Sequence, residues 1–234
     1  MKYSILNASN DFASLSNSIG RFKEKLCKEL SLEFTSQDFR LVFLDTIQQY
    51  LLSLTSYIRP FTELQQRVSP KEFLKILNIG ISTVRKYEAS GIIYKFPIES
   101  LVTMIHFQID SFFGDICSQA GTPHTGFYKR MKCVLDTTSI EGTKKDAFRN
   151  TLQCLAFFRN SFHNAGHHTI HTAQWKDGAE PVKGVLDREF SKAEWKMEFK
   201  HNEVVAYNWK NAFLLIQDSV EVTQLLIMAI YANE

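Results

Sequence analysis

The sequence predicts an all-α fold, a bundle of long amphipathic helices with a small β-hairpin inserted before the C-terminal helix. Glycine and proline together supply 15 of the 234 residues, about 6% where roughly 12% is usual, so turn-forming residues are too few for a many-stranded β fold. Apolar residues recur at three- and four-residue steps along most of the chain. The 44% hydrophobic content, with 19 phenylalanines, predicts one domain over 1–234 with an aromatic core.

Two long helices are predicted in the N-terminal third. Residues 11–32 carry apolar side chains at helical spacing, and Thr35 or Ser36 is expected to cap a second helix that reaches about Tyr57. Pro60 is expected to end it, because proline has no N–H to donate and its ring clashes with the preceding turn.

Two short helices are expected next. Ser69 and Glu72 have the spacing of a capping box, which predicts a helix to about Leu77. Ser82 is expected to cap the following helix, and Gly91 is expected to end it.

Three further helices follow in the middle of the chain. Pro97 is expected to open a long one that reaches about Cys117, and residues 127–135 form a shorter one. Thr143 is expected to cap the third, which reaches about His163.

The pattern changes after this helix. Residues 195–200 and 204–207 alternate weakly between polar and apolar, and the three residues between them predict a small hairpin. The last predicted helix runs from Trp209 to about Tyr231.

Charge and composition narrow the function classes. The net charge of +2 neither requires nor excludes a nucleic acid or membrane partner. The N-terminal residues contain no apolar stretch long enough for a signal peptide, no segment has the roughly 20 apolar residues of a membrane span, and the four cysteines form no C-x-x-C pair. We therefore expect a cytoplasmic protein without membrane contact or cofactor. The basic residues around Lys23 are expected on a solvated face.

The most informative segment begins at Arg159 and reads R-N-S-F-H-N-A-G. Arg159 and His163 are four residues apart, so they lie one turn apart on the same face of a helix, with Asn160 beside them. This arrangement places a permanent cation, a group that titrates near neutrality and an amide at a helix C-terminus, which favours a protonated imidazole. A protonated imidazole at this position suits a general acid.

An Arg-Asn pair followed shortly by His, late in a helix of an all-α bundle, resembles the HEPN superfamily (higher eukaryotes and prokaryotes nucleotide-binding). With the hairpin and closing helix, residues 143–231 resemble the HEPN-like proteins of bacterial defence and toxin systems, many of which are dimeric, metal-independent ribonucleases. The resemblance implies a homodimer that acts on RNA, with a possible antitoxin or defence-system partner. It implies that Arg159 stabilises the negative charge that develops on the phosphate, that Asn160 orients the phosphate and that His163 transfers the proton. The neighbouring polar residues are expected to bind substrate: Asn164, His167 and His168.

The sequence departs from the family pattern at one point. Four to six residues usually separate the arginine from the histidine, whereas three separate Arg159 from His163, and His167 and His168 lie too far along. Two alternatives follow: a variant active site with a helical i, i+4 pair, or a catalytically silent module that dimerises or binds RNA. A third interpretation, in which these polar residues only cap and bridge the helix end, also stays open.

Two other patterns suggest different chemistry. The segment 69–95 resembles the helix-turn-helix of MerR-type DNA binders, and in that alternative four residues would face DNA: Ser82, Thr83, Arg85 and Lys86. Histidines recur at four-residue steps from His163, but Gly166 is expected to break the helix and no carboxylate or cysteine is near. No metal site is therefore predicted.

Overall fold

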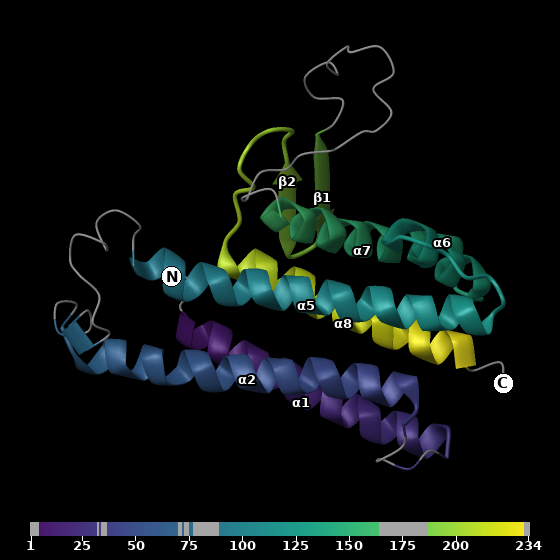
Figure 1. Ribbon diagram of the computed structural model, residues 1–234, viewed down its shortest axis with the longest axis horizontal. Coiled ribbons are helices and arrows are strands. Elements are labelled where there is room, and N and C mark those ends of the chain that lie inside the picture. The colour runs from purple at the N-terminus through teal and green to yellow at the C-terminus, as the bar shows by residue number, and fades with distance from the viewer. Residues whose placement is uncertain are drawn as a thin grey trace. The chain divides into compact units, whose positions relative to one another are not determined.

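The computed structural model describes residues 5–31, 33, 37–69, 72, 75–76, 89–163 and 187–231. These residues form six labelled helices and one two-stranded antiparallel sheet, which confirms the predicted all-α class with a hairpin before the C-terminal helix (Figure 1). The chain divides into two compact units, Met1–Met104 and Ile105–Glu234, and the long helix α5 contributes residues to both.

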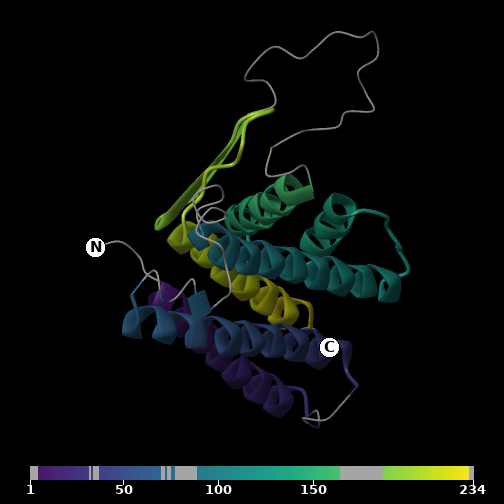
Figure 2. The ribbon, with the colours of Figure 1, turned by 60° about the vertical axis from the view of Figure 1, so that its left-hand side comes forward.

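The first unit is built on α1 (Ile5–Glu29) and α2 (Phe39–Arg67), which pack side by side in both ribbon views (Figures 1 and 2). The expected apolar stripes line their contact. Its buried members are Phe12, Leu15, Ile19, Leu26, Phe43, Ile47, Leu51 and Ile58. Gly20 allows a close approach, because a Cβ there would lie 2.9 Å from Gln48 Nε2, which donates to the carbonyl of Ser16.

Lys23 corrects one expectation about this unit. Its side chain is 1% exposed and pairs with Asp45 of α2, so it is not on a solvated face. A buried ammonium group requires a partner because desolvation is costly, and Asp45 supplies one across the helix contact.

The start and end of α2 differ from the prediction. Asp38 caps the helix, with Oδ1 accepting from Arg40 N at 2.9 Å, while Thr35 and Ser36 lie outside the described residues. Pro60 does not end the helix, which continues to Arg67. Pro60 and Ser56 are both exposed, so water can bond to the carbonyl that the missing N–H leaves open.

The capping box at Ser69 is confirmed. Glu72 accepts from Ser69 N at 2.9 Å, and Ser69 Oγ accepts from Glu72 N at 3.3 Å. The predicted helix end at Gly91 and helix start at Pro97 are both wrong. Helix α5 (Ala89–Gln119) begins before Gly91 and contains both residues. Ile98, Leu101 and Val102 follow Pro97 and are buried, and their packing outweighs one lost helical hydrogen bond.

The second unit contains residues 105–119 of α5, α6 (Phe127–Thr137), α7 (Gly142–His163) and α8 (Trp209–Tyr231). Helix α7 begins at Gly142, one residue before the predicted cap at Thr143. Helix α8 packs against α7, α6 and β2, and one side of it is buried, including Leu215, Ile216, Ser219 and Val220. Its length and mean hydropathy of 1.6 over Trp209–Ile230 also meet the criteria for a membrane span, with 56% of that window buried within the protein.

One strand of the hairpin is the predicted 195–200, found as β2, but its partner is not the predicted one. β1 (Arg188–Lys192) runs antiparallel to β2 (Trp195–Phe199), with Phe190 opposite Met197. The predicted partner 204–207 forms no strand; only Val204 is in an isolated bridge. Phe190 is the one apolar residue of β1, so an alternating pattern is scarcely visible there.

Candidate functional site

The C-terminal turns of α7 divide into an apolar and a polar side. Leu152, Leu155 and Phe158 are buried, as the helical spacing predicts. Arg159 is half-buried and Asn160 is exposed. At about 100° per residue, Asn160 lies about 200° from Phe158, on the opposite side of the helix, whereas Arg159 lies about 100° from both. Arg159 is therefore at the border between the buried and the exposed side, next to Asn160.

Arg159 is held by its neighbour. Its Nη1 donates to Asn160 Oδ1 at 3.0 Å. Its Nε is buried, and within the described part of the chain it has no hydrogen-bond partner. A buried donor without a partner costs about 1–3 kcal/mol, and the described residues leave this N–H available to one.

His163 is the last residue of α7, one turn after Arg159 along the helix. The side chain of His163 is not among the described parts of the structure. The predicted substrate-binding residues Asn164, His167 and His168 lie outside the described residues, as do Ser82, Thr83, Arg85 and Lys86 of the DNA-binding alternative. The structure thus brings Arg159 and Asn160 together and leaves the other predicted site residues as predictions.

Aromatic rings hold the chain after the hairpin against this end of α7. Phe199, the last residue of β2, lies 5.7 Å from Phe157 between ring centroids. Tyr207 lies 4.7 Å from Phe158 and 6.3 Å from Phe162. The segment from 199 to 207 therefore flanks the turns that carry Arg159 and Asn160.

His201 is a polar residue of that segment which the sequence argument did not select for the site. It is half-buried, and its backbone N–H donates to Asp187 Oδ1 at 2.9 Å. Its Nδ1 is buried without a hydrogen-bond partner in the part of the chain that the structure describes. Neither His201 nor Tyr207 could be found from local spacing, because each is about 40 or more residues from α7 in sequence.

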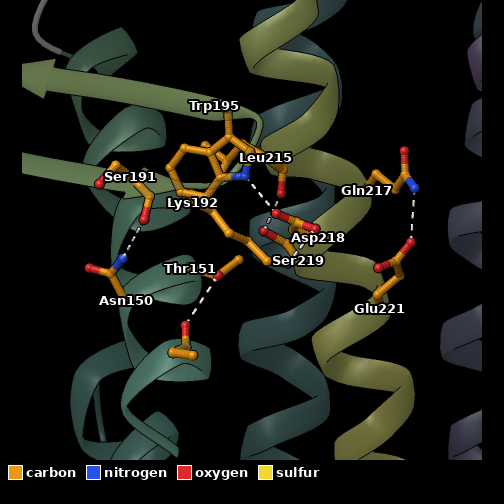
Figure 3. Close-up of polar contacts among 11 residues, drawn as sticks. Asn150, Thr151, Ser191, Lys192, Trp195, Leu215, Gln217, Asp218, Ser219 and Glu221 are labelled. Carbon is orange, nitrogen blue, oxygen red and sulfur yellow. Dashed lines mark hydrogen bonds and ion pairs between the residues drawn. The ribbon is translucent and has the colours of Figure 1, made fainter. Parts of the chain in front are cut away.

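The turn of the hairpin is fixed to α8 by a carboxylate. Asp218, whose side chain is 15% exposed, accepts from Trp195 Nε1 at 2.5 Å and from Lys192 Nζ at 2.6 Å (Figure 3). Trp195 is 3% exposed. These contacts set the hairpin's position on the helices that carry the candidate site.

Side-chain amides bind both outer edges of the hairpin. Ser191 and Lys196 are opposite each other in the strand register. The Ser191 carbonyl accepts from Asn150 of α7 at 3.4 Å, and the Lys196 carbonyl accepts from Asn211 of α8 at 2.9 Å. Each strand is thereby bonded to a different helix of the unit.

Metal-ligating residues do not cluster in the described ranges, where no group of three or more His, Cys, Asp or Glu is placed to hold an ion. The chemistry that the described residues offer at the end of α7 is therefore cationic and hydrogen-bonding: a guanidinium oriented by an amide, with a histidine one turn further on.

Fold and site together define a helical unit whose C-terminal helix pair carries a docked hairpin and an Arg-Asn pair at a helix end. Comparison with family models, with curated proteins and with solved structures finds no match to this chain.

Proposed function

We propose that the chain is a metal-independent endoribonuclease of the HEPN type, acting in the cytoplasm as a homodimer within a bacterial defence or toxin system. The observation that carries the proposal is the Arg159–Asn160 pair at the end of α7, with a buried arginine donor unsatisfied by the described residues. The resemblance of the R-N-S-F-H-N-A-G string to the HEPN motif supplies the substrate class.

The proposed reaction is an internal transesterification. His163 takes the proton from a ribose 2′-hydroxyl, and the 2′-oxygen forms a bond to the adjacent phosphorus. The bond from phosphorus to the 5′-oxygen breaks, and that oxygen receives a proton from an imidazolium. The products are a 2′,3′-cyclic phosphate and a 5′-hydroxyl, so no water or metal ion enters the balance.

Arg159 and Asn160 have separate roles in this reaction. The guanidinium of Arg159 stabilises the negative charge that grows on the phosphate oxygens. Asn160 fixes the guanidinium through its Oδ1 and orients the phosphate. In a homodimer two such sets would share one cleft, so that one His163 acts as the base and the other as the acid.

The test is cleavage of a mixed-sequence labelled RNA in EDTA. We expect the wild type to cleave and to leave cyclic phosphate ends, and His163→Ala to lose about 10²–10⁴-fold in rate. Arg159→Ala should lose activity as well. Arg149→Ala is the matched control. Arg149 lies on the same helix, ten residues before Arg159, and forms an ion pair with Asp146.

Three results would count against the proposal. Cleavage that survives both Arg159→Ala and His163→Ala would refute the assigned roles. RNA binding without cleavage by the wild type would favour the catalytically silent module. A single monomeric species at micromolar concentration in sedimentation would contradict the shared cleft.

A further inference from the structure

Two cysteines of the second unit meet where α5 turns toward α6. Helix α5 ends in a Schellman motif: Gly121 has φ of +69° and its N–H donates to Ser118 O at 3.1 Å, while Thr122 N–H donates to Cys117 O at 2.9 Å. Glycine suits this left-handed position. The turn thereby fixes Thr122 next to Cys117.

Thr122 in this turn also contacts the second cysteine, Cys133. Thr122 Oγ1 lies 3.4 Å from Cys133 Sγ on α6. Cys117 Sγ lies 3.8 Å from the carbonyl oxygen of Arg130, which is three residues before Cys133 on the same helix. These two contacts bring both sulfur atoms to the same junction between α5 and α6.

The helices that carry the thiols are held in place by Arg130. Its Nε donates to His124 O at 2.9 Å, and its Nη1 donates to Asp110 Oδ1 at 2.9 Å. Gly114 makes room for the guanidinium, since a Cβ there would lie 3.3 Å from Arg130 Cζ. The thiol pair is thus preorganised by a fixed contact between the helices.

The two thiols differ in their surroundings. Cys117 is buried, and this burial, together with the neighbouring Cys133 thiol, raises the pKa of Cys117 to about 12. Cys133 is half-buried, so small solutes reach its sulfur first. The pair has the form of an accessible thiol with a protected partner beside it.

We propose that Cys117 and Cys133 form an oxidation site at which a hydroperoxide converts the dithiol into a disulfide between α5 and α6. The Cys133 thiolate attacks one peroxide oxygen, the O–O bond breaks, and Cys133 becomes a sulfenic acid while water or an alcohol leaves. Cys117 sulfur then attacks the sulfenic sulfur, and the S–O bond breaks with loss of water. The two thiols are oxidised by two electrons and the peroxide is reduced by two.

The experiment treats the full-length chain with hydrogen peroxide and maps the products by peptide mass spectrometry. We expect one intramolecular link between the peptides of Cys117 and Cys133, with Cys27 and Cys154 still free thiols. The rate should rise with pH because the thiolate is the nucleophile. The link closes a loop of about 15 residues, so the oxidised protein should melt about 6–12 °C higher.

Single variants separate the steps. Cys117→Ser should accumulate a sulfenic acid on Cys133 that dimedone traps, whereas Cys133→Ser should form no link and Cys154→Ser should behave as wild type. A link to Cys27 or Cys154, a link between chains, or thiols that stay reduced while a surface control peptide oxidises would each overturn the proposal. The mass measurement is independent of RNA cleavage, so either proposal can fail alone.

Discussion

The carboxylate of Asp218 offers the most direct test of how the hairpin is attached. Asp218→Ala removes the acceptor for the indole N–H of Trp195, which is 3% exposed and would be left buried without a partner. Such an orphaned donor costs about 1–3 kcal/mol. The ion pair with Lys192 adds at most about 1 kcal/mol, because the lysine side chain is 49% exposed. We expect a total loss of about 1–4 kcal/mol.

The measurement is the free energy of unfolding in urea, compared across three variants. Asp218→Asn keeps an oxygen that can accept from Trp195, so it should lose only about 1 kcal/mol. Lys192→Met removes the ion pair and leaves the indole bond, so it should lose less than about 1 kcal/mol. Amide exchange at Met197 should accelerate in Asp218→Ala, because the strand is released from α8.

The reasoning is refuted if Asp218→Ala is no less stable than Lys192→Met. That result would mean that the indole finds another acceptor or water, and that the hairpin is held by its apolar contacts alone.

Two further predictions concern the first unit. Lys23→Met leaves Asp45 without its partner. Because Asp45 is 45% exposed, we expect the free energy of unfolding to fall by about 1–3 kcal/mol, less than the roughly 3–5 kcal/mol of a fully buried pair. Wild-type stability in urea unfolding would contradict this. Burial works to raise the pKa of Asp38, but the hydrogen bonds and charge of Arg40 outweigh it and hold the pKa below its ordinary value of 3.8. The stabilisation is therefore present above that value and lost as pH falls through the lower, folded-state pKa, so Asp38→Ala should cost about 1 kcal/mol at pH 7 and progressively less in acid. Thermal melts of both proteins across the acid range measure this difference, and a gap that stays constant with pH would exclude the charged cap.

Helix positions were predictable because each amphipathic stripe is a local property of the sequence. The errors occur where tertiary packing or solvent decides. Pro60 and Pro97 both lie inside helices, one where water replaces the lost bond and one where buried neighbours outweigh it. β1 was missed because its turn, Ala193–Glu194, has no glycine or asparagine to signal a two-residue hairpin.

In the candidate site, too, local contacts were predictable from the sequence and contacts between distant residues were not. Arg159 and Asn160 are adjacent in sequence, so spacing alone placed them together. The contacts of Tyr207 with Phe158 and Phe162, and the ion pair of Lys23 with Asp45, join residues distant in sequence, and no local pattern records such pairs.

The amide bonds at the two edges of the hairpin have a consequence for self-association. An isolated pair of strands exposes backbone groups on both outer edges, which can template the addition of strands from other molecules. Here the outward carbonyl of Ser191 is bonded to Asn150 and that of Lys196 to Asn211. Among the described residues the sheet has two strands, and these bonds hinder the addition of a further strand at these positions on either edge.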